Sequence, residues 1–413
     1  MKPDLSKTRK VFFIGIGGIG ISALAKMALS RGMQISGVND EEGKTVDSLR
    51  ELGVEVVSRG ILDTLPGADL YVYSDAWIYR GPELLEKAKE TGKPVLSYFE
   101  ALGIFAREYK VIAVAGTHGK TTTTAMVAEI LIEAGLDPTV IVGSFVKKFN
   151  SNFRMGKSEY LVVEADEYMR HFLNFHPYIA VITNIDADHL DYYKDLADIQ
   201  DAFKQLRAQS ETVVEDYSKY FNQVPVLLVP GEHNRQNAAA ALAVADFLKI
   251  DLENAKKSLQ NFNGTWRRLE KIGKTKRGTI VYDDYSHHPT EIRVAISALR
   301  ELYPTKKITV VFQPHLYSRT KALFGDFALS FGQADKVIFL PIYFAREERD
   351  ESISSYKLAQ AVRLQGVDAE AFADFQGAED AVRALKLGSK DVFVTMGAGE
   401  AYKVADQAYP ELK

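Results

Sequence analysis

Residues 111–121 read Val-Ile-Ala-Val-Ala-Gly-Thr-His-Gly-Lys-Thr, an apolar run that leads into a glycine-rich loop with a lysine. The run Val111–Ala115 is typical of a buried strand, and Thr122–Ala134 has the pattern of a helix. A loop between a strand and a helix N-terminus turns backbone N–H groups toward a phosphate chain. The stretch therefore predicts a phosphate-binding α/β domain.

This loop is a shortened form of the GxxxxGK[ST] pattern, because Val114 stands where the first glycine belongs. Lys120 supplies positive charge for the phosphates, and the Thr121 hydroxyl is suited to Mg²⁺. The alternative is a glycine turn with an incidental lysine, which the strand–loop–helix context disfavours. The residues that we expect around the nucleotide phosphates are Gly116, Thr117, His118, Gly119, Lys120, Thr121 and Thr122.

Outward from this loop, short apolar strands alternate with helical patterns along the whole chain. Such alternation is typical of α/β folds, in which helices cover parallel sheets. We expect three units, over residues 1–108, 109–273 and 274–413, with a doubly wound sheet in the third. The second join falls in the Lys/Gly-rich stretch 271–278, which suits a hinge or a hairpin turn. The predicted strands are 10–14, 34–38, 70–73, 111–115, 160–163, 179–183, 279–282, 307–312, 336–340 and 391–395, and the first helix is 19–31.

The composition is that of an ordinary globular protein, with 46% hydrophobic and 26% charged residues among 413. Lys plus Arg number 51 and Asp plus Glu 55, a net charge of −4 that argues against a nucleic-acid binder. The absence of cysteine excludes disulfides, thiol nucleophiles and cysteine-ligated zinc. No apolar run approaches the ~20 residues of a membrane span, and the polar start is too short for a signal peptide. We therefore expect a cytoplasmic protein that binds neither nucleic acid nor membrane.

Acidic clusters follow two predicted strands of the second unit. Glu164–Glu167 (Glu-Ala-Asp-Glu) ends one strand, and Thr183–His189 (Thr-Asn-Ile-Asp-Ala-Asp-His) ends the next. α/β enzymes place their ligand groups at these strand ends. Oxygen ligands beside Thr121 suit Mg²⁺, and His189 adds a site for a second divalent ion. Either cluster alone is equally well explained as solvated turn residues, but two clusters in the domain of the phosphate loop favour a metal site.

The eight histidines are concentrated in segments that other residues already single out. One such histidine is more often structural than catalytic, whereas six together favour a functional interpretation. We interpret His171 and His176 as packing or surface residues. The six histidines in candidate segments are His118, His189, His233, His287, His288 and His315.

A second glycine loop, Gly15–Gly20 (Gly-Ile-Gly-Gly-Ile-Gly), lies between the first predicted strand and helix. Asp40 follows twenty residues after Gly20, as in a dinucleotide-binding fold. Alone, this pattern indicates an NAD(P)-dependent oxidoreductase, or glycines that merely permit close strand–helix packing. Nothing beyond the first unit supports hydride chemistry.

Taken together and in this order, the motifs resemble those of the Mur ligase family, the ATP-dependent amide ligases of bacterial peptidoglycan synthesis. The resemblance spans nearly the whole chain. It implies a Rossmann-like domain for a UDP-sugar, a central P-loop ATPase-like domain and a C-terminal Rossmann-like domain for an amino acid. The matching segments are Gly15–Gly20, Ala115–Thr124, Glu164–Glu167, Thr183–His189, Gly231–Asn237, Gly264–Arg268, Asp283–Thr290 and Phe312–His315.

The resemblance also implies the reaction. ATP phosphorylates a substrate carboxylate, and an amine attacks the acyl phosphate and displaces phosphate. Asp283–Thr290 and Phe312–His315 are most similar to the alanine-adding branch, which implies UDP-N-acetylmuramate and L-alanine as substrates. ATP with Mg²⁺, or Mn²⁺, is the implied cofactor set, and a monomer or homodimer the implied assembly.

The roles that the family implies can be assigned residue by residue. Lys120, Glu164, His189, His287 and Arg319 would serve catalysis, and Thr121, Glu164 and His189 would hold the metal ions. The bidentate fork of Arg319 suits the amino-acid carboxylate, beside Tyr285 and His287. The remaining implied residues are His233, Asn234, Asn237, Arg268, Asp284 and Tyr285 for ATP, and Gly15, Gly17, Gly18, Ile19, Gly20 and Asp40 for the UDP-sugar.

The sequence departs from the family pattern in three places. Leu316 stands where many alanine-adding enzymes have a second arginine, which leaves Arg319 alone for the carboxylate. The stretch 210–229 is short, so we expect a reduced central domain. In the first domain, Ser58-Arg59-Gly60 replaces a usual Gly-His pair, and Ser74-Asp75-Ala76 replaces Ser-Ser-Ala.

The sequence leaves alternatives open for the role of Lys204 and for the function of the chain. Lys204 lies where sibling ligases carry a carbamylated lysine, although a solvated helix lysine explains it better. A recycling ligase that attaches a tripeptide to the same acceptor would need a wider amine pocket than the alanine-like His315 segment suggests. A non-catalytic nucleotide-binding relative is disfavoured by the presence of Lys120, Thr121, Glu164 and His189.

Overall fold

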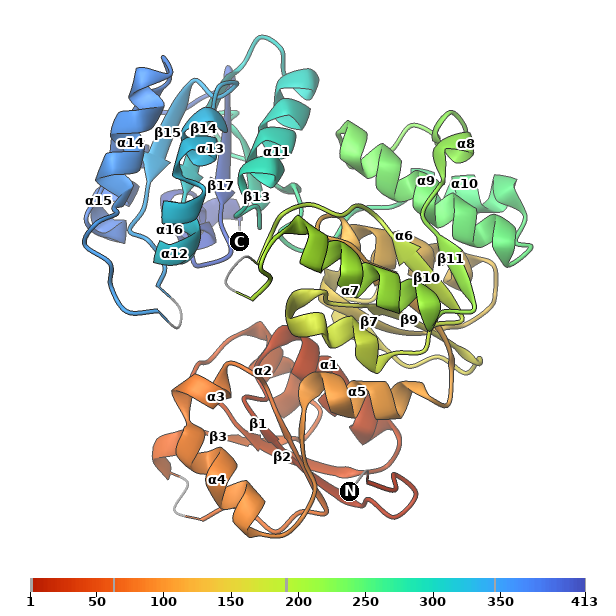
Figure 1. The fold of residues 1–413 in the computed structure, drawn as a ribbon. Helices are drawn as coiled ribbons and strands as arrows, with labels where there is room; N and C mark the ends of the chain where they lie inside the picture. Colours follow the sequence, from red (N-terminus) through yellow and green to blue (C-terminus); the bar gives the residue numbers. More distant parts are fainter. Residues whose placement is uncertain (1–2, 62–63, 190–191, 345–346, 413) are drawn as a thin grey trace. The chain divides into compact units, whose positions relative to one another are not determined.

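The strands form three sheets, which follow one another along the chain (Figure 1). The computed structural model describes residues 3–61, 64–189, 192–344 and 347–412. The chain divides into two compact units, unit 1 with residues Met1–Val226 and Gln236–Asn263, and unit 2 with Leu227–Arg235 and Gly264–Lys413. Unit 1 contains the first two sheets, and unit 2 contains the third.

The first sheet has the strand order β3-β2-β1-β4-β5, and all its strand pairs are parallel. This order reverses direction between β1 and β4, so a ligand crevice is expected at the carboxyl ends of these two strands. The strands are β1 Lys10–Ile14, β2 Gln34–Val38, β3 Glu55–Val57, β4 Leu70–Tyr73 and β5 Val95–Ser97. The helices are α1 Ile19–Ser30, α2 Lys44–Arg50, η1 Arg59–Ile61, α3 Trp77–Arg80, α4 Pro82–Glu90 and α5 Tyr98–Ala106.

The second sheet has the order β11-β10-β6-β9-β7-β8, and its central strand β6 leads into the phosphate loop. The only antiparallel pair among its described strands is β7–β8, a hairpin that the sequence patterns did not predict. Its strands are β6 Lys110–Ala115, β7 Thr139–Val146, β8 Ser151–Arg154, β9 Tyr160–Glu164, β10 Ile179–Ile182 and β11 Thr212–Val214. The accompanying helices are α6 Lys120–Glu133, η2 Tyr168–Asn174, α7 Leu196–Ala208, α8 Ser218–Phe221, α9 Glu232–Phe247 and α10 Leu252–Gln260.

The third sheet has the order β12-β13-β17-β14-β15-β16. Strands β12 and β13 form an antiparallel hairpin, so the stretch 271–278 is a strand and a turn rather than a hinge, and the sheet begins at Glu270. The strands are β12 Glu270–Lys274, β13 Ile280–Asp284, β14 Lys307–Phe312, β15 Lys336–Phe339, β16 Asp368–Ala371 and β17 Asp391–Met396. The helices are α11 Pro289–Leu302, α12 Tyr317–Ala322, α13 Phe324–Leu329, α14 Ser355–Leu364, α15 Phe375–Ala384, α16 Tyr402–Ala408 and η3 Pro410–Leu412.

The central strands are buried on both faces, which explains why they appear in the sequence as continuous apolar runs. In unit 1 the first two sheets share one hydrophobic core. Phe105 from α5, Phe172 from η2 and Phe203 from α7 all belong to it. No helix in the described part of the chain is both long and apolar enough to cross a bilayer.

Candidate active site

The phosphate loop has the geometry that its glycines allow. Strand β6 ends at Ala115 and helix α6 begins at Lys120, with Gly119 in the left-handed conformation as its N-cap (φ 85°). Gly116 has φ 133°, and a Cβ atom there would overlap the Thr183 hydroxyl. The first N–H groups of α6 have no acceptor within the helix, so they can bind an anion.

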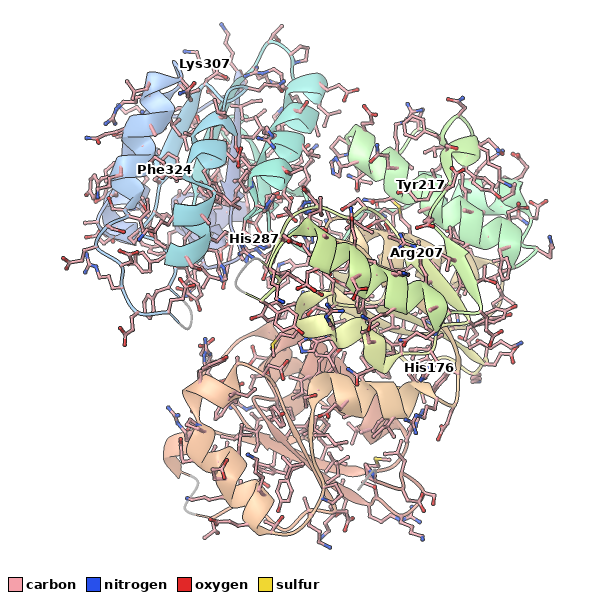
Figure 2. All side chains as sticks on the ribbon, viewed as in Figure 1. His176, Arg207, Tyr217, His287, Lys307 and Phe324 are labelled. Carbon is pink, nitrogen blue, oxygen red and sulfur yellow. The ribbon has the colours of Figure 1, made fainter. Side chains whose placement is uncertain are left out.

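The segment after β10 holds this loop in place. The N–H groups of Thr117 and His118 donate to the backbone and side-chain oxygens of Asn184, at 3.0 and 2.9 Å. The Thr183 hydroxyl donates to His118 O at 2.6 Å, and Asp186 N donates to the Thr117 hydroxyl at 2.9 Å. Tyr217, labelled in Figure 2, donates from its hydroxyl to Thr183 O at 2.6 Å. The loop is therefore preorganised, and phosphate binding is left to the helix N-terminus.

The structure brings Thr121 and Glu164 together, as the sequence led us to expect. The Thr121 hydroxyl donates to both carboxylate oxygens of Glu164, at 2.9 and 3.1 Å. Gly143 N donates to Glu164 Oε2 at 2.8 Å, and a Cβ atom at Gly143 would overlap that carboxylate. These are hard oxygen ligands beside an anion-binding helix terminus, so the pair fits Mg²⁺.

Lys120 is bound to a second carboxylate, Glu167, which the sequence-based assignment omitted. Its Nζ donates to the two Glu167 oxygens at 2.8 and 3.0 Å, and to Gly116 O at 2.7 Å. Burial alone would lower the pKa of Lys120, but Glu167 together with Asp166 and Glu164 outweighs burial and raises it. The lysine is therefore a charged group held against its own loop.

The two carboxylates near Lys120, Glu167 and Asp166, have pKa values that are shifted in opposite directions. Burial raises the pKa of Glu167 to about 7, with Lys120 opposing the shift and Asp166 adding to it. Burial would also raise the pKa of Asp166, but the hydrogen bond from His171 and the charges of Lys120 and His189 lower it overall. Glu167 was part of the acidic cluster in the sequence, but its direction after the strand end could not be read from spacing.

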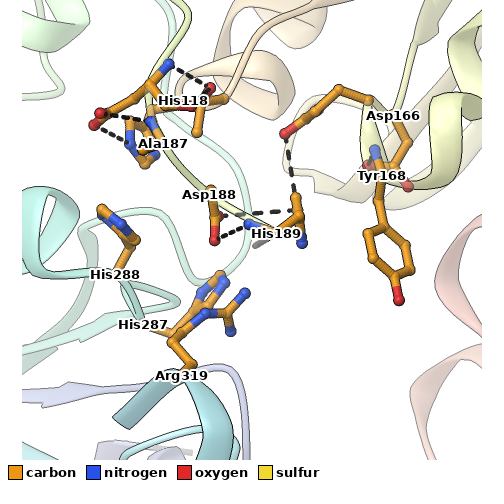
Figure 3. A network of polar contacts seen from close by, with 12 residues as sticks. His118, Asp166, Tyr168, Ala187, Asp188, His189, His287, His288 and Arg319 are labelled. Carbon is orange, nitrogen blue, oxygen red and sulfur yellow. Dashed lines mark hydrogen bonds and ion pairs between the residues drawn. The ribbon is translucent and has the colours of Figure 1, made fainter. Parts of the chain in front are cut away.

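His189 lies in the same acidic cluster. Its Nε2 is 3.8 Å from Glu167 Oε1 and 3.9 Å from Asp188 Oδ2 (Figure 3). Ligand atoms of Asp166, Glu167 and His189 all lie within 4.8 Å of one another, a spacing that could hold one divalent cation. His118, on the phosphate loop, has its Nε2 3.4 Å from Asp186 Oδ2.

In the first sheet, the loop Gly15–Gly20 packs so closely against neighbouring side chains that a residue with a Cβ atom would overlap them. A Cβ atom at Gly15 (φ 82°) would overlap the Trp77 ring. Gly17 N donates to the Asn39 side-chain oxygen at 3.1 Å. Asp40 instead accepts from Arg59, at 3.1 Å from its N–H and 3.3 Å from its guanidinium. Asn39, which the sequence-based assignment did not include, thus contacts the loop through its side chain, as does Thr45, whose hydroxyl donates to Gly17 O.

In the third sheet, the Arg267 side chain forms hydrogen bonds at the carboxyl ends of the strands. This buried guanidinium donates to Asp283 Oδ2 at 2.7 Å, Gly399 O at 2.9 Å and Gly397 O at 2.6 Å. The guanidinium carbon of Arg268 lies 5.0 Å from the centre of the Tyr285 ring.

Asp284 is occupied within unit 2 as well. Its carboxylate accepts from Leu269 N, and from Ser286 N at 2.8 Å, while burial raises its pKa. The structure thus gives Asp284 a local structural role beside its expected contact with ATP.

The expected amino-acid pocket residues meet at the end of β14. His315 Nδ1 is 3.3 Å from Arg319 Nη1, and the His315 ring stacks on Tyr343 with ring centres 5.5 Å apart. The His287 ring lies 5.9 Å from the His315 ring. Leu316 has φ 71° and is 5% exposed, so its side chain belongs to the core of unit 2.

The segment Gly231–Asn237, which contains three of the residues expected to bind ATP, falls at the start of helix α9, which both units share. In unit 2, burial lowers the pKa of His233 to about 4, and Asn234 donates to Pro230 O at 2.7 Å. In unit 1, Asn237 packs against Gly119, where a Cβ atom would overlap the Asn237 side-chain oxygen. His176 is exposed (Figure 2), and Lys204 is exposed on α7, as a solvated lysine would be.

Three family models match consecutive parts of the chain. The Mur ligase family catalytic domain matches residues 10–110, the Mur ligase middle domain residues 114–224, and the Mur ligase glutamate ligase domain residues 267–399. These matches fall on the segments that carry the three sheets.

Curated relatives match over the full length. The chain is 38% identical to the UDP-N-acetylmuramate–L-alanine ligase of Caldanaerobacter subterraneus subsp. tengcongensis, with 100% of both chains covered. It is 39% identical to the enzyme of the same name from Caldicellulosiruptor saccharolyticus, over 95% of this chain and 97% of the relative. The crystal structure of the UDP-N-acetylmuramate–alanine ligase of Thermotoga maritima superposes with a TM-score of 0.81 at 27% identity, covering 97% of this chain and 98% of that one.

Proposed function

The chain belongs to the Mur ligase family, and on that basis we propose that it joins L-alanine to the carboxylate of UDP-N-acetylmuramate at the expense of ATP. The ATP-dependent ligase chemistry follows from the family. The choice of L-alanine and UDP-N-acetylmuramate rests on relatives that carry this name along their whole length.

One observation carries the proposal most strongly: Lys120 and Thr121 begin α6, and each is hydrogen-bonded to a glutamate at the end of β9. Phosphoryl transfer needs little covalent help from a protein, but it needs fixed charges around the transferring group. The phosphate loop supplies these charges. It follows β6 at the centre of the second sheet, where the chain connections lead to opposite sides of the sheet, and open α/β sheets bind their ligands at such a point.

The donor set at this point fits a magnesium ion. Thr121 and Glu164 would hold one ion, and His189 with Glu167 a second; Mn²⁺ would suit the same ligands. Bound Mg²⁺ neutralises charge on the phosphate oxygens. Gly143 N fixes the orientation of Glu164 beforehand, so the carboxylate is already directed toward the Thr121 hydroxyl.

The reaction has two steps. A carboxylate oxygen of the muramyl group forms a bond to the γ-phosphorus of ATP, and the bond to ADP breaks. The amine of L-alanine then attacks the acyl carbon, loses a proton, and displaces phosphate to leave an amide. Lys120 binds the transferring phosphoryl group in the first step, for which it must exchange its contact with Glu167 for one with the phosphate.

We assign the substrates to the three domains that were expected over residues 1–108, 109–273 and 274–413. The glycine loop Gly15–Gly20 with α1 would bind the UDP-sugar diphosphate, and ATP would lie on the phosphate loop, reached by His233, Asn237 and Arg268. Arg319 with His315, His287 and Tyr285 would bind L-alanine. The reaction would take place in the cytoplasm, catalysed by a monomer or a homodimer.

Phosphate release by the purified protein tests the proposal. Mg-ATP and UDP-N-acetylmuramate are held constant while each of the twenty amino acids, and the tripeptide of the recycling reaction, are added in turn. We expect release only when both the acceptor and L-alanine are present, and release slower by about 10²–10³-fold with Lys120→Ala. Release that requires the tripeptide, or no release with any amine, would reject the proposed activity.

A further inference from the structure

His171 joins the first two sheets of unit 1 through its ring. Its Nε2 lies 2.9 Å from Asp75 Oδ2, and its Nδ1 lies 3.4 Å from Asp166 Oδ2. The ring also stacks on Phe99 of α5, with centres 3.9 Å apart and an angle of 13° between the planes. The side chain is only 11% exposed. One buried ring therefore touches two carboxylates from different sheets.

The two carboxylates belong to the two places where substrates are expected. Asp75 follows β4 at the reversal point of the first sheet, next to Ser74, whose Cβ would lie 3.2 Å from a Cβ atom at Gly15. Asp166 follows β9, and its ligand atom lies within 4.8 Å of those of Glu167 and His189. His171 is thus a direct link between the glycine-loop crevice and the acidic cluster.

The local fold is built to place this ring. Met169 and Arg170 have positive φ angles of 50° and 59°, which interrupt η2 and turn residue 171 toward α5. Phe172 anchors the segment from the other side, buried against Phe203 at a ring distance of 5.0 Å. Positive φ at two consecutive non-glycine residues is unfavourable, and such strain is found where a side chain must be positioned.

Both ring nitrogens face acceptors, an arrangement that suits the doubly protonated imidazolium, in which both nitrogens donate. A ring whose two nitrogens both face carboxylates, and which is packed flat on an aromatic ring, has little freedom to reorient.

We propose that His171 is a positioning residue of the ligase reaction, which holds the Asp75 turn of the UDP-sugar crevice in register with the Asp166–Glu167 cluster at the phosphate loop. This inference rests on the proposed function, because the reaction requires the muramyl carboxylate from one sheet to meet the ATP phosphate on the next. A misplacement of about 1 Å between reacting groups lowers rates about a hundredfold.

A double-mutant cycle tests the proposal. His171→Phe keeps the stacking surface and removes both ring donors, and Asp75→Ala removes one acceptor. We expect His171→Phe to lower kcat by about tenfold to a hundredfold while the KM for ATP changes less than threefold. The double variant should be no slower than His171→Phe, since both changes remove the same contact between His171 and Asp75.

Gln209→Ala is the matched control, because Gln209 donates to Leu173 O at 3.1 Å and Phe175 O at 2.6 Å and so supports the same segment without contacting Asp75. It should lower the urea midpoint of unfolding and leave kcat within twofold of wild type. Independent, multiplicative losses in the cycle, a His171→Phe kcat within twofold of wild type, or a control as slow as His171→Phe would overturn the proposal.

The same cycle measured by urea unfolding needs no substrate, so it separates this proposal from the proposed function. Additive effects of the two changes on stability would show that the link is absent, whatever the protein catalyses. Non-additive effects in a protein that makes no product would reject the proposed function and leave the link in place.

Discussion

The Nζ of Lys120 lies 2.8 Å from Glu167 Oε2, so the lysine of the phosphate loop is paired with a carboxylate that is 3% exposed. In the reaction that we propose, this ammonium would turn to the γ-phosphate. The pair would then keep the lysine charged and close to the phosphates, and ATP would have to break this ion pair on binding.

The first prediction concerns this pair. Lys120→Ala should lower kcat by about 10²–10³-fold, because one charged donor to the transferring phosphoryl group is lost. Glu167→Gln removes the competing charge while it retains the shape, so the KM for ATP should fall if the ion pair opposes binding. Initial rates over a range of ATP concentrations check both. An unchanged KM in Glu167→Gln would show that ATP does not compete with this carboxylate.

A second prediction concerns Glu164. Glu164→Gln keeps an acceptor for the Thr121 hydroxyl and removes the negative charge that a magnesium ion needs. We expect the Mg²⁺ concentration for half-maximal rate to rise at least tenfold, with Mn²⁺ recovering part of the loss. A magnesium titration of phosphate release measures this. An unaltered titration curve would place the metal elsewhere.

A substitution at Leu316 tests whether this side chain serves core packing or the binding of the amino acid. Because this side chain is buried in unit 2, Leu316→Ala should cost about 2–4 kcal/mol of unfolding free energy by leaving a cavity. The KM for L-alanine should stay within twofold, whereas Arg319→Ala should raise it at least tenfold. Urea unfolding and the KM for L-alanine, measured on the two variants, check these expectations. A KM change in Leu316→Ala larger than that in Arg319→Ala would assign Leu316 to the amino-acid pocket.

The burial of His233 predicts a pH effect on stability. The pKa of His233 is lowered by burial from 6.5 to about 4, so folding disfavours its charged form. A lowered folded-state pKa gives stability that is present above pH 6.5 and is lost as the pH falls toward about 4. The unfolding midpoint should therefore fall more steeply across this range in wild type than in His233→Gln. Parallel curves would mean that His233 is not buried as a neutral ring.

The sequence was most informative where chemistry and backbone geometry share the same residues. The loop Gly116–Thr121 contains both the positive-φ glycines and the lysine, so the strand, turn and helix could be predicted together. The pairing of Thr121 with Glu164 also followed, since Glu164 ends β9 and Thr121 lies in the first turn of the helix that follows the neighbouring parallel strand β6.

Other features depend on contacts between distant parts of the chain. Spacing could not show that Glu167 turns back to Lys120, or that Asn39 rather than Asp40 meets the glycine loop. The sequence led us to interpret His171 as a packing or surface residue, because its partners, Asp75 and Asp166, come together only when the first two sheets share a core. Spacing also could not show that the Leu316 side chain is buried, since this depends on its backbone turn at φ 71°.

The fate of the oxygen atoms of the muramyl carboxylate distinguishes an acyl-phosphate mechanism from cleavage of ATP by water. UDP-N-acetylmuramate labelled with ¹⁸O in that carboxylate is incubated with the protein, Mg-ATP and L-alanine, and the phosphate released is analysed by mass spectrometry. The acyl-phosphate mechanism predicts that each phosphate carries one ¹⁸O atom, because the carboxylate oxygen leaves with it. Unlabelled phosphate would mean that ATP is cleaved by water and that the proposed ligase reaction does not take place.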